Sequence, residues 1–307
     1  MVCGSYGKIL KKKWTYKMII KKYPRTKHLE DSKLQPGDEG MGGITFQDLP
    51  DDATYVYEEK VDGANSGFSF DAGGIMFAQS RGHFLHTYDR NFSREDDWKL
   101  FKDWLIAHED EFLDRFEDRY LIYGEWCGIV HSVFYDRLPH YFLEFDILDK
   151  TTGEMLSTEE RRKLLDGLPI VSVPVLYQGP KTDLKHLKSL AIRQSEFQTP
   201  NQNHTPAWLP NLEKACQLVN DNFDDRIKKM VTKPEMEGIY IKVEKDGKVI
   251  DRYKWVNPNF TQTIENSNEH WQSRFPVPNL LVKQTDIFPS YLVGNNLKKK
   301  ENNLNIY

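Results

Sequence analysis

The chain repeatedly places two alternating polar and apolar runs on either side of a short turn sequence. Residues 237–243 and 248–255 flank Glu-Lys-Asp-Gly, and residues 64–70 and 75–80 flank Asp-Ala-Gly-Gly. Such pairs predict β-hairpins. No regular strand–helix–strand alternation accompanies them. We therefore expect an α+β fold, with antiparallel sheets flanked by helices, and not a doubly wound parallel sheet.

The other elements are predicted from periodicity and capping residues. A long helix capped by Ser93 is expected, because apolar residues recur along one face of it and should belong to the core. The residues on that face are Trp98, Phe101, Leu105, His108, Phe112 and Phe116. Ser157 should cap a short helix that ends at Gly167. Further strands are predicted over 121–126, 141–148 and 169–178, and further helical segments over 184–195 and 212–230.

Composition excludes several classes of protein. The 307 residues include 39% hydrophobic and 13% aromatic residues, enough for a buried core, and a net charge of -4 gives no general affinity for nucleic acid. Three widely spaced cysteines indicate neither a disulfide framework nor a zinc site. No segment predicts a secretory signal or a membrane span, so we expect an intracellular, cytoplasmic protein without membrane contact. Basic residues gather only locally, at 8–27 and 298–300, either as frayed ends or as phosphate contacts.

Several charged residues fall on faces that should be apolar. Alternation places Glu237 with Ile239 and Ile241, and it places Glu125 with Leu121 and Tyr123. A buried carboxylate needs a donor or a cation, so each glutamate predicts a partner, and a structural ion pair is one explanation.

On the strand that follows, Arg252 and Lys254 share a face and are about 6.7 Å apart at the usual rise per residue. That spacing suits a phosphate group, although two solvated basic residues are the alternative. A further lysine, Lys60, ends an alternating run just before the turn-forming Asp62-Gly63 pair. By itself it is as typical of an edge-strand solubility residue as of a chemical group.

Taken in chain order, six short motifs resemble those of the covalent nucleotidyltransferase superfamily, which contains ATP-dependent DNA ligases, RNA ligases and mRNA capping enzymes. The motifs are Lys60-Val-Asp-Gly63, Ser80-Arg-Gly82, Tyr123-Gly-Glu-Trp126, Leu143-Glu-Phe-Asp146, Glu237-Gly-Ile-Tyr240 and Arg252-Tyr-Lys254. The run from Glu59 to Asn65, the short gap to Arg81 and the Phe145-Asp146-Ile147 step are most similar to the phage RNA ligase 2 branch. The resemblance covers roughly residues 55–260.

This resemblance implies an ATP-dependent RNA ligase that uses Mg²⁺ (or Mn²⁺) and acts on RNA ends, nicked or single-stranded, as in RNA repair. Lys60 would be the nucleophile that forms lysyl-AMP, with Lys254 and Glu237 as further catalytic residues and Glu237 also at the metal. The nucleotide would be held by Glu59, Asn65, Arg81, Glu125, Phe145, Lys242, Arg252 and Lys254. Asp62 is expected to orient the turn, whereas His83 and His86 are interpreted as loop residues and not as metal ligands. Because an ordinary lysine is protonated at pH 7, we expect nearby cations to lower the pKa of Lys60.

Alternatives remain open at this stage. A DNA nick ligase or an RNA-capping guanylyltransferase shares the lysine chemistry, and a non-catalytic nucleotide-binding or nucleic-acid-binding module shares the pocket. Lysine usually occupies the first basic position of the last motif, and Arg252 stands there instead. Arginine keeps the charge but donates a proton less readily, which leaves any acid role of this position in doubt.

The resemblance also suggests an organisation into segments. Residues 1–40 are expected to form a basic extension packed on the core, and 41–262 the nucleotidyltransferase domain, with a helical insertion at about 180–234. Residues 263–307 would form a short C-terminal extension, too short for the oligonucleotide-binding (OB) barrel that DNA ligases and capping enzymes append there. The oligomeric state is not predicted.

Overall fold

The computed structural model describes residues 20–34, 38, 40–89, 92–202, 206–229, 235–260, 276–282 and 285–288. The basic residues at 8–17 and at 298–300, which the sequence singles out, lie outside these described residues. Among the described residues, no helix is both long enough and apolar enough to cross a bilayer.

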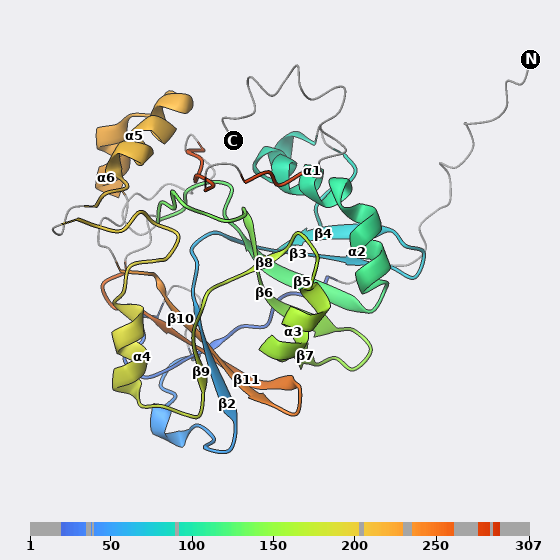
Figure 1. Ribbon diagram of the computed structural model, residues 1–307, viewed down its shortest axis with the longest axis vertical. Coiled ribbons are helices and arrows are strands. Elements are labelled where there is room, and N and C mark those ends of the chain that lie inside the picture. Colours follow the sequence, from blue (N-terminus) through green and yellow to red (C-terminus); the bar gives the residue numbers. More distant parts are fainter. Residues whose placement is uncertain are drawn as a thin grey trace, which may run out of the picture.

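An eleven-stranded, mainly antiparallel sheet organises the chain (Figure 1). Its strands are β1 (Lys27–His28), β2 (Thr54–Glu59), β3 (Ala64–Phe70), β4 (Met76–Ser80), β5 (Tyr120–Trp126), β6 (Phe142–Asp149), β7 (Met155–Leu156), β8 (Val171–Ser172), β9 (Val175–Gly179), β10 (Gly238–Lys245) and β11 (Lys248–Val256). The main path runs β4-β3-β5-β6-β7-β11-β10-β2-β9, with β1 beside β11 and β8 beside β6. Only these two side pairings are parallel within the described sheet. The predicted α+β class is confirmed.

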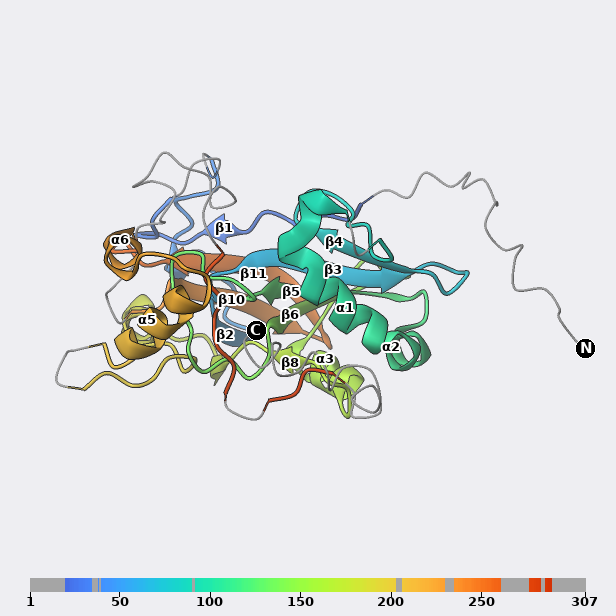
Figure 2. The same ribbon diagram turned by 90° about the horizontal axis from the view of Figure 1, so that it is seen from above.

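Helices cover the two halves of the sheet separately. They are α1 (Lys99–Ala107), α2 (Glu109–Phe116), α3 (Thr158–Leu165), α4 (Leu184–Ala191), α5 (Leu209–Leu218) and α6 (Phe223–Lys229), with 3-10 turns η1 (Phe46–Asp48) and η2 (Ser93–Trp98). Aromatic residues of α1 and α2 pack around Phe68 of β3 in the larger core. Leu187 and Leu190 of α4 join a second core with β2, β10 and β11. Figure 2 shows α5 and α6 at the opposite end of the molecule from α2.

Both predicted hairpins are present. β3 pairs with β4, and β10 pairs with β11. The second turn places Asp246 and Gly247 consecutively at φ of 52° and 77°. Two successive left-handed residues match the twist of a tight hairpin, which explains why Asp-Gly stands there. Ser157 caps α3 as predicted, because its side chain accepts a hydrogen bond from the Glu160 amide.

Three predicted elements are divided in the structure. The long helix predicted from Ser93 is wrong, because its first turn is 3-10 and the α-helix breaks at His108, whose ring bonds the Ile287 carbonyl at 3.0 Å and contacts Glu111. The side chains on its apolar face are nonetheless buried. The strand predicted over 169–178 is two short strands that pair with different partners, β8 with β6 and β9 with β2, on either side of Pro174. The helical segment 212–230 separates into α5 and α6 near Asn220, which has a φ of 56°.

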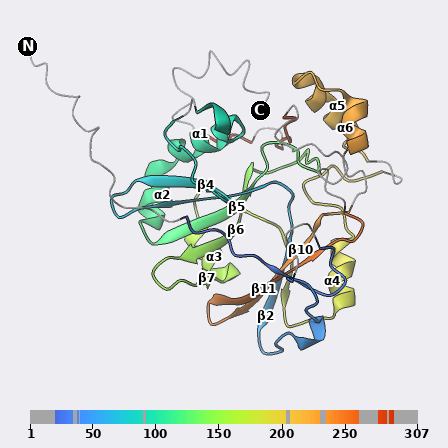
Figure 3. The same ribbon diagram turned by 180° about the vertical axis from the view of Figure 1, so that it is seen from behind.

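The segment that begins at residue 20 crosses the sheet. Its aromatic residue Tyr23 contacts Tyr123 of β5 and Phe145 of β6, and β1 then pairs with β11. Figure 3 shows this dark blue segment running over the strands from one half of the sheet to the other. It therefore lies next to the residues that the motifs bring together.

Candidate active site

Lys60 lies where the chain passes from one half of the sheet to the other. β2 ends at Glu59 beside β10, and β3 starts at Ala64 beside β5. The crossing is held at Lys60, whose amide donates to the Gly238 carbonyl at 3.0 Å. Asp62 anchors it further, because its buried carboxylate accepts the amides of Ser132 and Val133 at 2.6 and 2.8 Å.

Gly63 completes the crossing. A Cβ at this position would lie 2.7 Å from the Trp126 carbonyl, so no larger residue fits without a shift of backbone. Its amide faces Glu125 Oε1 at 3.2 Å. The Lys-x-Asp-Gly pattern thus has a physical reason at each fixed letter: a held amine, a carboxylate anchor and a close approach of two strands.

The Lys60 ammonium contacts the Glu237 carboxylate, with 2.6 Å between Nζ and Oε1. The Lys60 side chain is 17% exposed and that of Glu237 is 1% exposed. Glu237 immediately precedes β10, and its carboxylate meets the Lys60 ammonium that lies over the Tyr240 ring, so the prediction that it shares a face with Ile239 and Ile241 is wrong. Its second oxygen, Oε2, is buried and has no hydrogen-bond partner among the residues that the structure describes.

The electrostatics of this pair differ from the prediction. Burial lowers the pKa of Lys60, but Glu237, Tyr240 and Glu125 outweigh burial and raise it above its usual value. Burial raises the pKa of Glu237 to about 7, against the opposing effect of Lys60. Without a nucleotide the amine is therefore held in its charged form, and the expected lowering of its pKa by neighbouring cations is wrong for this state.

A polar wall lies on the other half of the sheet. Asn65 and Glu125 are direct cross-strand neighbours on β3 and β5, so their side chains lie on one face. Burial raises the pKa of Glu125 to about 8, with Lys60 lowering it. The Oδ1 atom of Asn65 is buried and has no hydrogen-bond partner in the described part of the chain. Arg81 is exposed just after β4, and its charge acts on Tyr240.

Phe145 stands at a β-bulge. Tyr123 pairs with Asp146 and Gly124 pairs with Glu144, so Phe145 is the extra residue of β6. Bulges re-aim side chains and are common beside active sites. The Phe145 ring lies nearly parallel to that of Tyr240, at 19° and 6.3 Å between centroids, and the Lys60 ammonium lies 5.7 Å from the Tyr240 ring centroid.

The two cations of β11 have different partners. Arg252 lies over the Tyr23 ring at 5.1 Å and is 3.6 Å from Asp146 Oδ2. Lys254 bonds Asp38 at 2.8 Å, and burial lowers the pKa of Lys254, with Lys60 acting in the same direction. The strand thus brings both cations to the face where Tyr240 lies, as their shared face predicted.

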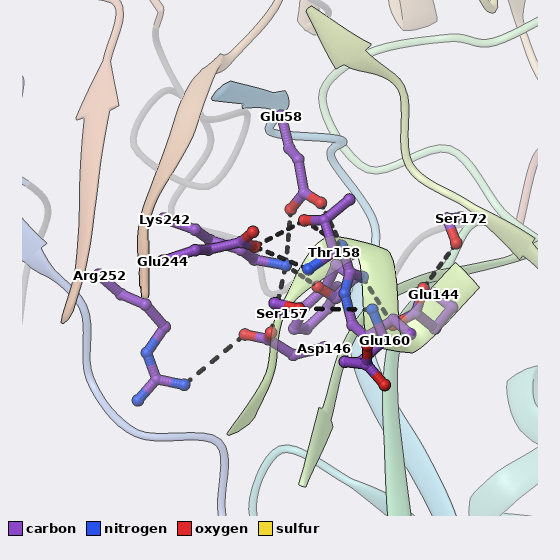
Figure 4. Close-up of polar contacts among 12 residues, drawn as sticks. Glu58, Glu144, Asp146, Ser157, Thr158, Glu160, Ser172, Lys242, Glu244 and Arg252 are labelled. Atoms are coloured by element: carbon purple, nitrogen blue, oxygen red, sulfur yellow. Dashed lines mark hydrogen bonds and ion pairs between the residues drawn. The ribbon is translucent and has the colours of Figure 1, made fainter. Parts of the chain in front are cut away.

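Lys242, the cross-strand neighbour of Arg252, belongs to a buried ionic cluster on the same face (Figure 4). Its ammonium lies 2.9 Å from Glu58 Oε2 and 3.1 Å from Asp146 Oδ1, and it also donates to the Phe145 carbonyl. Arg161 of α3 completes the cluster at 2.5 Å from Glu58 and 2.7 Å from Glu144. Lys242 is 3% exposed, and its bond to the Phe145 carbonyl holds that backbone in place.

Glu59 lies apart from Lys60 although the two are adjacent in sequence. It is 1% exposed, and burial raises its pKa to about 7, with Ser195 opposing the rise. The side chain therefore lies inside the protein, away from the open face. His83 and His86 bond Ser80 and Glu95, and no cluster of metal-ligand residues is present among the described positions.

Four residues near the site escaped the sequence analysis as functional candidates: Tyr23, His28, Asp38 and Tyr240. Tyr240 was visible inside the Glu237-Gly-Ile-Tyr240 motif, but no pattern distinguishes its ring from a core aromatic residue. The other three precede the motifs: the crossing of residues 20–34 over the sheet brings Tyr23 to β6 and His28 to β11, and Asp38 lies against His28 and Lys254.

The model of the family described as RNA ligase matches residues 53–256. A lysine-to-alanine mutant of Naegleria gruberi RNA ligase with ATP and Mn is 15% identical, with a TM-score of 0.40, over 67% of this chain and 50% of that chain. The same ligase with PPi is 16% identical, with a TM-score of 0.42, over 71% of this chain and 52% of that chain. An apo mutant of it is 13% identical, with a TM-score of 0.44, over 72% of this chain and 53% of that chain. This chain thus spans about half the length of those structures. No curated protein sequence matches it.

Proposed function

Since the chain belongs to the RNA ligase family, we propose that it is an ATP-dependent RNA ligase with Lys60 as its nucleophile. The Lys60 amine attacks the α-phosphorus of ATP, a P–N bond forms, and the bond to pyrophosphate breaks. An RNA 5′-phosphate then attacks this phosphorus, which breaks the P–N bond, frees Lys60 and leaves AMP on the RNA. A 3′-hydroxyl finally attacks the 5′-phosphate, and AMP departs as the strand is sealed.

The contact between Lys60 and Glu237 carries the proposal. An amine that reacts with a nucleotide must be fixed in direction and still be reachable, and Lys60 is held at 2.6 Å from Glu237 with 17% of its side chain exposed. A lysine on a solvated strand edge, the alternative from the sequence, would have neither a buried carboxylate partner nor the anchored crossing at Asp62.

The surrounding residues fit a nucleotide. The aromatic pair Phe145 and Tyr240 offers flat apolar surfaces for the base, and Phe145 is the ring we assign to adenine stacking. Glu125, Asn65 and Arg81 are assigned to the ribose and its phosphate. Arg252 and Lys254 would offset negative charge at the α-phosphate in the transition state. For Lys242 and Glu59, which are buried, we propose indirect roles: Lys242 acts through the Phe145 carbonyl, and Glu59 through the end of β2.

Lys60 must lose a proton before it attacks, whereas the Glu237 carboxylate raises the pKa of Lys60 and so stabilises the ammonium. Glu237 Oε2 and Asn65 Oδ1 have no hydrogen-bond partner in the described part of the chain, and both are hard oxygen donors of the kind that Mg²⁺ or Mn²⁺ prefers. A divalent ion bound at Glu237 would supply positive charge that favours the neutral amine. The carboxylate then no longer stabilises the ammonium, and Lys254 adds to the same effect.

RNA contacts are proposed along the crossing segment. Arg25 and Lys27 line, with Arg252 and Asp251, a cavity of about 230 Å³ beside β11. These cations lie next to a residue already assigned to phosphate, which supports an extension of the phosphate path toward the RNA end.

Intact mass spectrometry after incubation with magnesium and each nucleotide in turn tests the proposal. ATP should add one AMP to the wild type, and Lys60→Ala should abolish the adduct while the protein stays folded. Lys163→Ala, at an exposed lysine of α3, is the matched control and should be labelled normally. Label from GTP alone would indicate a capping guanylyltransferase, and label retained in Lys60→Ala would place the nucleophile elsewhere.

Substrate class is then tested with nicked duplexes whose strands are RNA or DNA. Sealing is expected where the ends are RNA. Sealing of all-DNA nicks alone would contradict the RNA ligase assignment, and binding without any AMP adduct would favour a non-catalytic module.

A further inference from the structure

Lys254 is tied to the segment that crosses the sheet by a chain of buried polar groups. Its ammonium lies 2.8 Å from Asp38 Oδ2, and His28 Nε2 lies 2.8 Å from the same oxygen. The three residues are 9%, 7% and 0% exposed for Lys254, Asp38 and His28. His28 and Asp38 lie outside residues 53–256, which the family model matches.

The hydrogen-bond partners of His28 show which of its ring nitrogens carries the proton. Ser32 Oγ accepts the Val256 amide at 2.9 Å, which leaves its own O–H to donate to His28 Nδ1 at 2.6 Å. The other ring nitrogen, Nε2, then carries the hydrogen that Asp38 accepts. Burial lowers the pKa of His28, in keeping with this neutral ring. The imidazole therefore fixes the carboxylate without adding a charge.

The strand pairing explains how these groups meet. β1 lies parallel to β11 with His28 opposite Lys254, so their side chains share one face. Burial alone raises the pKa of Asp38, but bonds from Lys254 and His28 lower it, so the carboxylate stays ionised. One of the three ammonium hydrogens of Lys254 is thus committed to Asp38, and the ammonium is restrained near Lys60 and Glu237, whose charges act on it.

We propose that Asp38, held by His28, is a positioning residue that fixes the Lys254 ammonium against the α-phosphate during the attack by Lys60. This inference rests on the proposed function. If Asp38 only stabilised the fold, its removal would change nucleotide affinity and reaction rate to the same extent. A positioning carboxylate acts mainly on the reaction, because a flexible lysine still binds a phosphate but is misplaced for the transition state.

The test separates binding from reaction. The single-turnover rate of AMP attachment at saturating ATP is measured by mass, and the Kd of an ATP analogue with an uncleavable α–β bridge is measured by calorimetry. For Asp38→Asn we expect a rate about 10- to 100-fold lower and a Kd changed by less than about threefold. Asp52→Asn, which removes the carboxylate of an exposed ion pair 2.7 Å from Lys245, is the matched control and should change neither quantity.

His28→Gln provides a second variant if Asp38→Asn does not fold at the assay temperature. It removes the ring but leaves the Asp38–Lys254 pair, and the rate should fall about three- to tenfold, the worth of one hydrogen bond. A wild-type rate in both variants, or equal losses in rate and affinity, would overturn the inference while AMP attachment by the wild type upholds the proposed function. A wild type that takes up no AMP would contradict both.

Discussion

One buried ionic cluster surrounds Glu58 of β2 and another surrounds Lys60, just after β2 ends. The two differ in how completely their carboxylate oxygens are paired. Around Glu58, three carboxylates meet the three cations Arg161, Lys242 and Arg252, and every carboxylate oxygen has a partner. Around Lys60, one cation faces Glu237, whose second oxygen has no hydrogen-bond partner among the described residues. The first lysine, Lys242, is 3% exposed and the second, Lys60, is 17% exposed.

The difference shows that a buried ion pair alone does not identify an active site. A closed cluster gains nothing from a ligand, because a ligand would have to displace existing partners at the full cost of buried charge. A cluster with an unpaired oxygen and a reachable amine can bind a ligand without that loss. We therefore interpret the Glu58 cluster as the scaffold that holds Phe145 and Arg252, and the Lys60 pair as the reactive part.

Removal of Arg161 should have the largest effect on stability. Arg161→Met leaves Glu58 and Glu144 without their shared cation, and a broken buried pair typically costs about 3–5 kcal/mol of unfolding free energy. Urea unfolding at pH 7 measures it. Lys163→Met, at an exposed lysine of the same helix, should change stability by less than about 0.5 kcal/mol. A loss below about 1 kcal/mol for Arg161→Met would mean that the cluster is not a scaffold.

Glu237→Gln should slow the reaction and leave stability nearly unchanged. It keeps the side-chain volume but loses the charge that orients Lys60, and we expect AMP attachment to slow about 10²–10³-fold, which corresponds to about 2.7–4 kcal/mol of barrier. The unfolding free energy should change by less than about 1 kcal/mol, since Lys60 can turn to solvent. Glu58→Gln is the matched change in the scaffold, and it should lower stability by several kcal/mol. Wild-type labelling by Glu237→Gln would remove the distinction between the clusters.

The sequence predicts the reactive cluster better than the scaffold. Lys60, Asp62 and Gly63 are neighbours in the chain and form one short motif, although the groups that they contact, at Ser132 and Trp126, are distant in sequence. The hairpin of β10 and β11 is likewise fixed by its turn residues, which places Arg252 and Lys254 on one face. The hairpin depends on short-range geometry that alternation and turn chemistry describe.

The features that the sequence did not predict depend on distant contacts. The break at His108 is tied to the carbonyl of Ile287, 179 residues away in the chain. The bulge that isolates Phe145 appears only when β5 and β6 are aligned. Arg161 and Asp38 carry no motif, and their roles follow from which strands become neighbours. Alternation also failed at Glu237, because the strand begins one residue later.

Glu59 lies in the chain between Glu58 and Lys60 and belongs to neither cluster. It is a buried carboxyl group that no cation contacts among the described residues. Burial raises its pKa to about 7, whereas the unfolded chain has a pKa near 4.5. Between these values the folded state holds a proton that the unfolded state has released. The stability that this group contributes is therefore present below about pH 4.5 and is lost as the pH rises through 7.

Glu59→Gln should remove that dependence, because the amide stays neutral at every pH. We expect equal stability of variant and wild type near pH 4, and a variant more stable by about 3 kcal/mol at pH 8, measured by urea unfolding at each pH. Glu125 and Glu237 also have raised pKa values, so the quantity to compare is the difference between variant and wild type. A difference that does not change with pH would show that Glu59 is ionised throughout. Burial without a partner would then not distinguish Glu59 from the paired carboxylates of the Glu58 cluster.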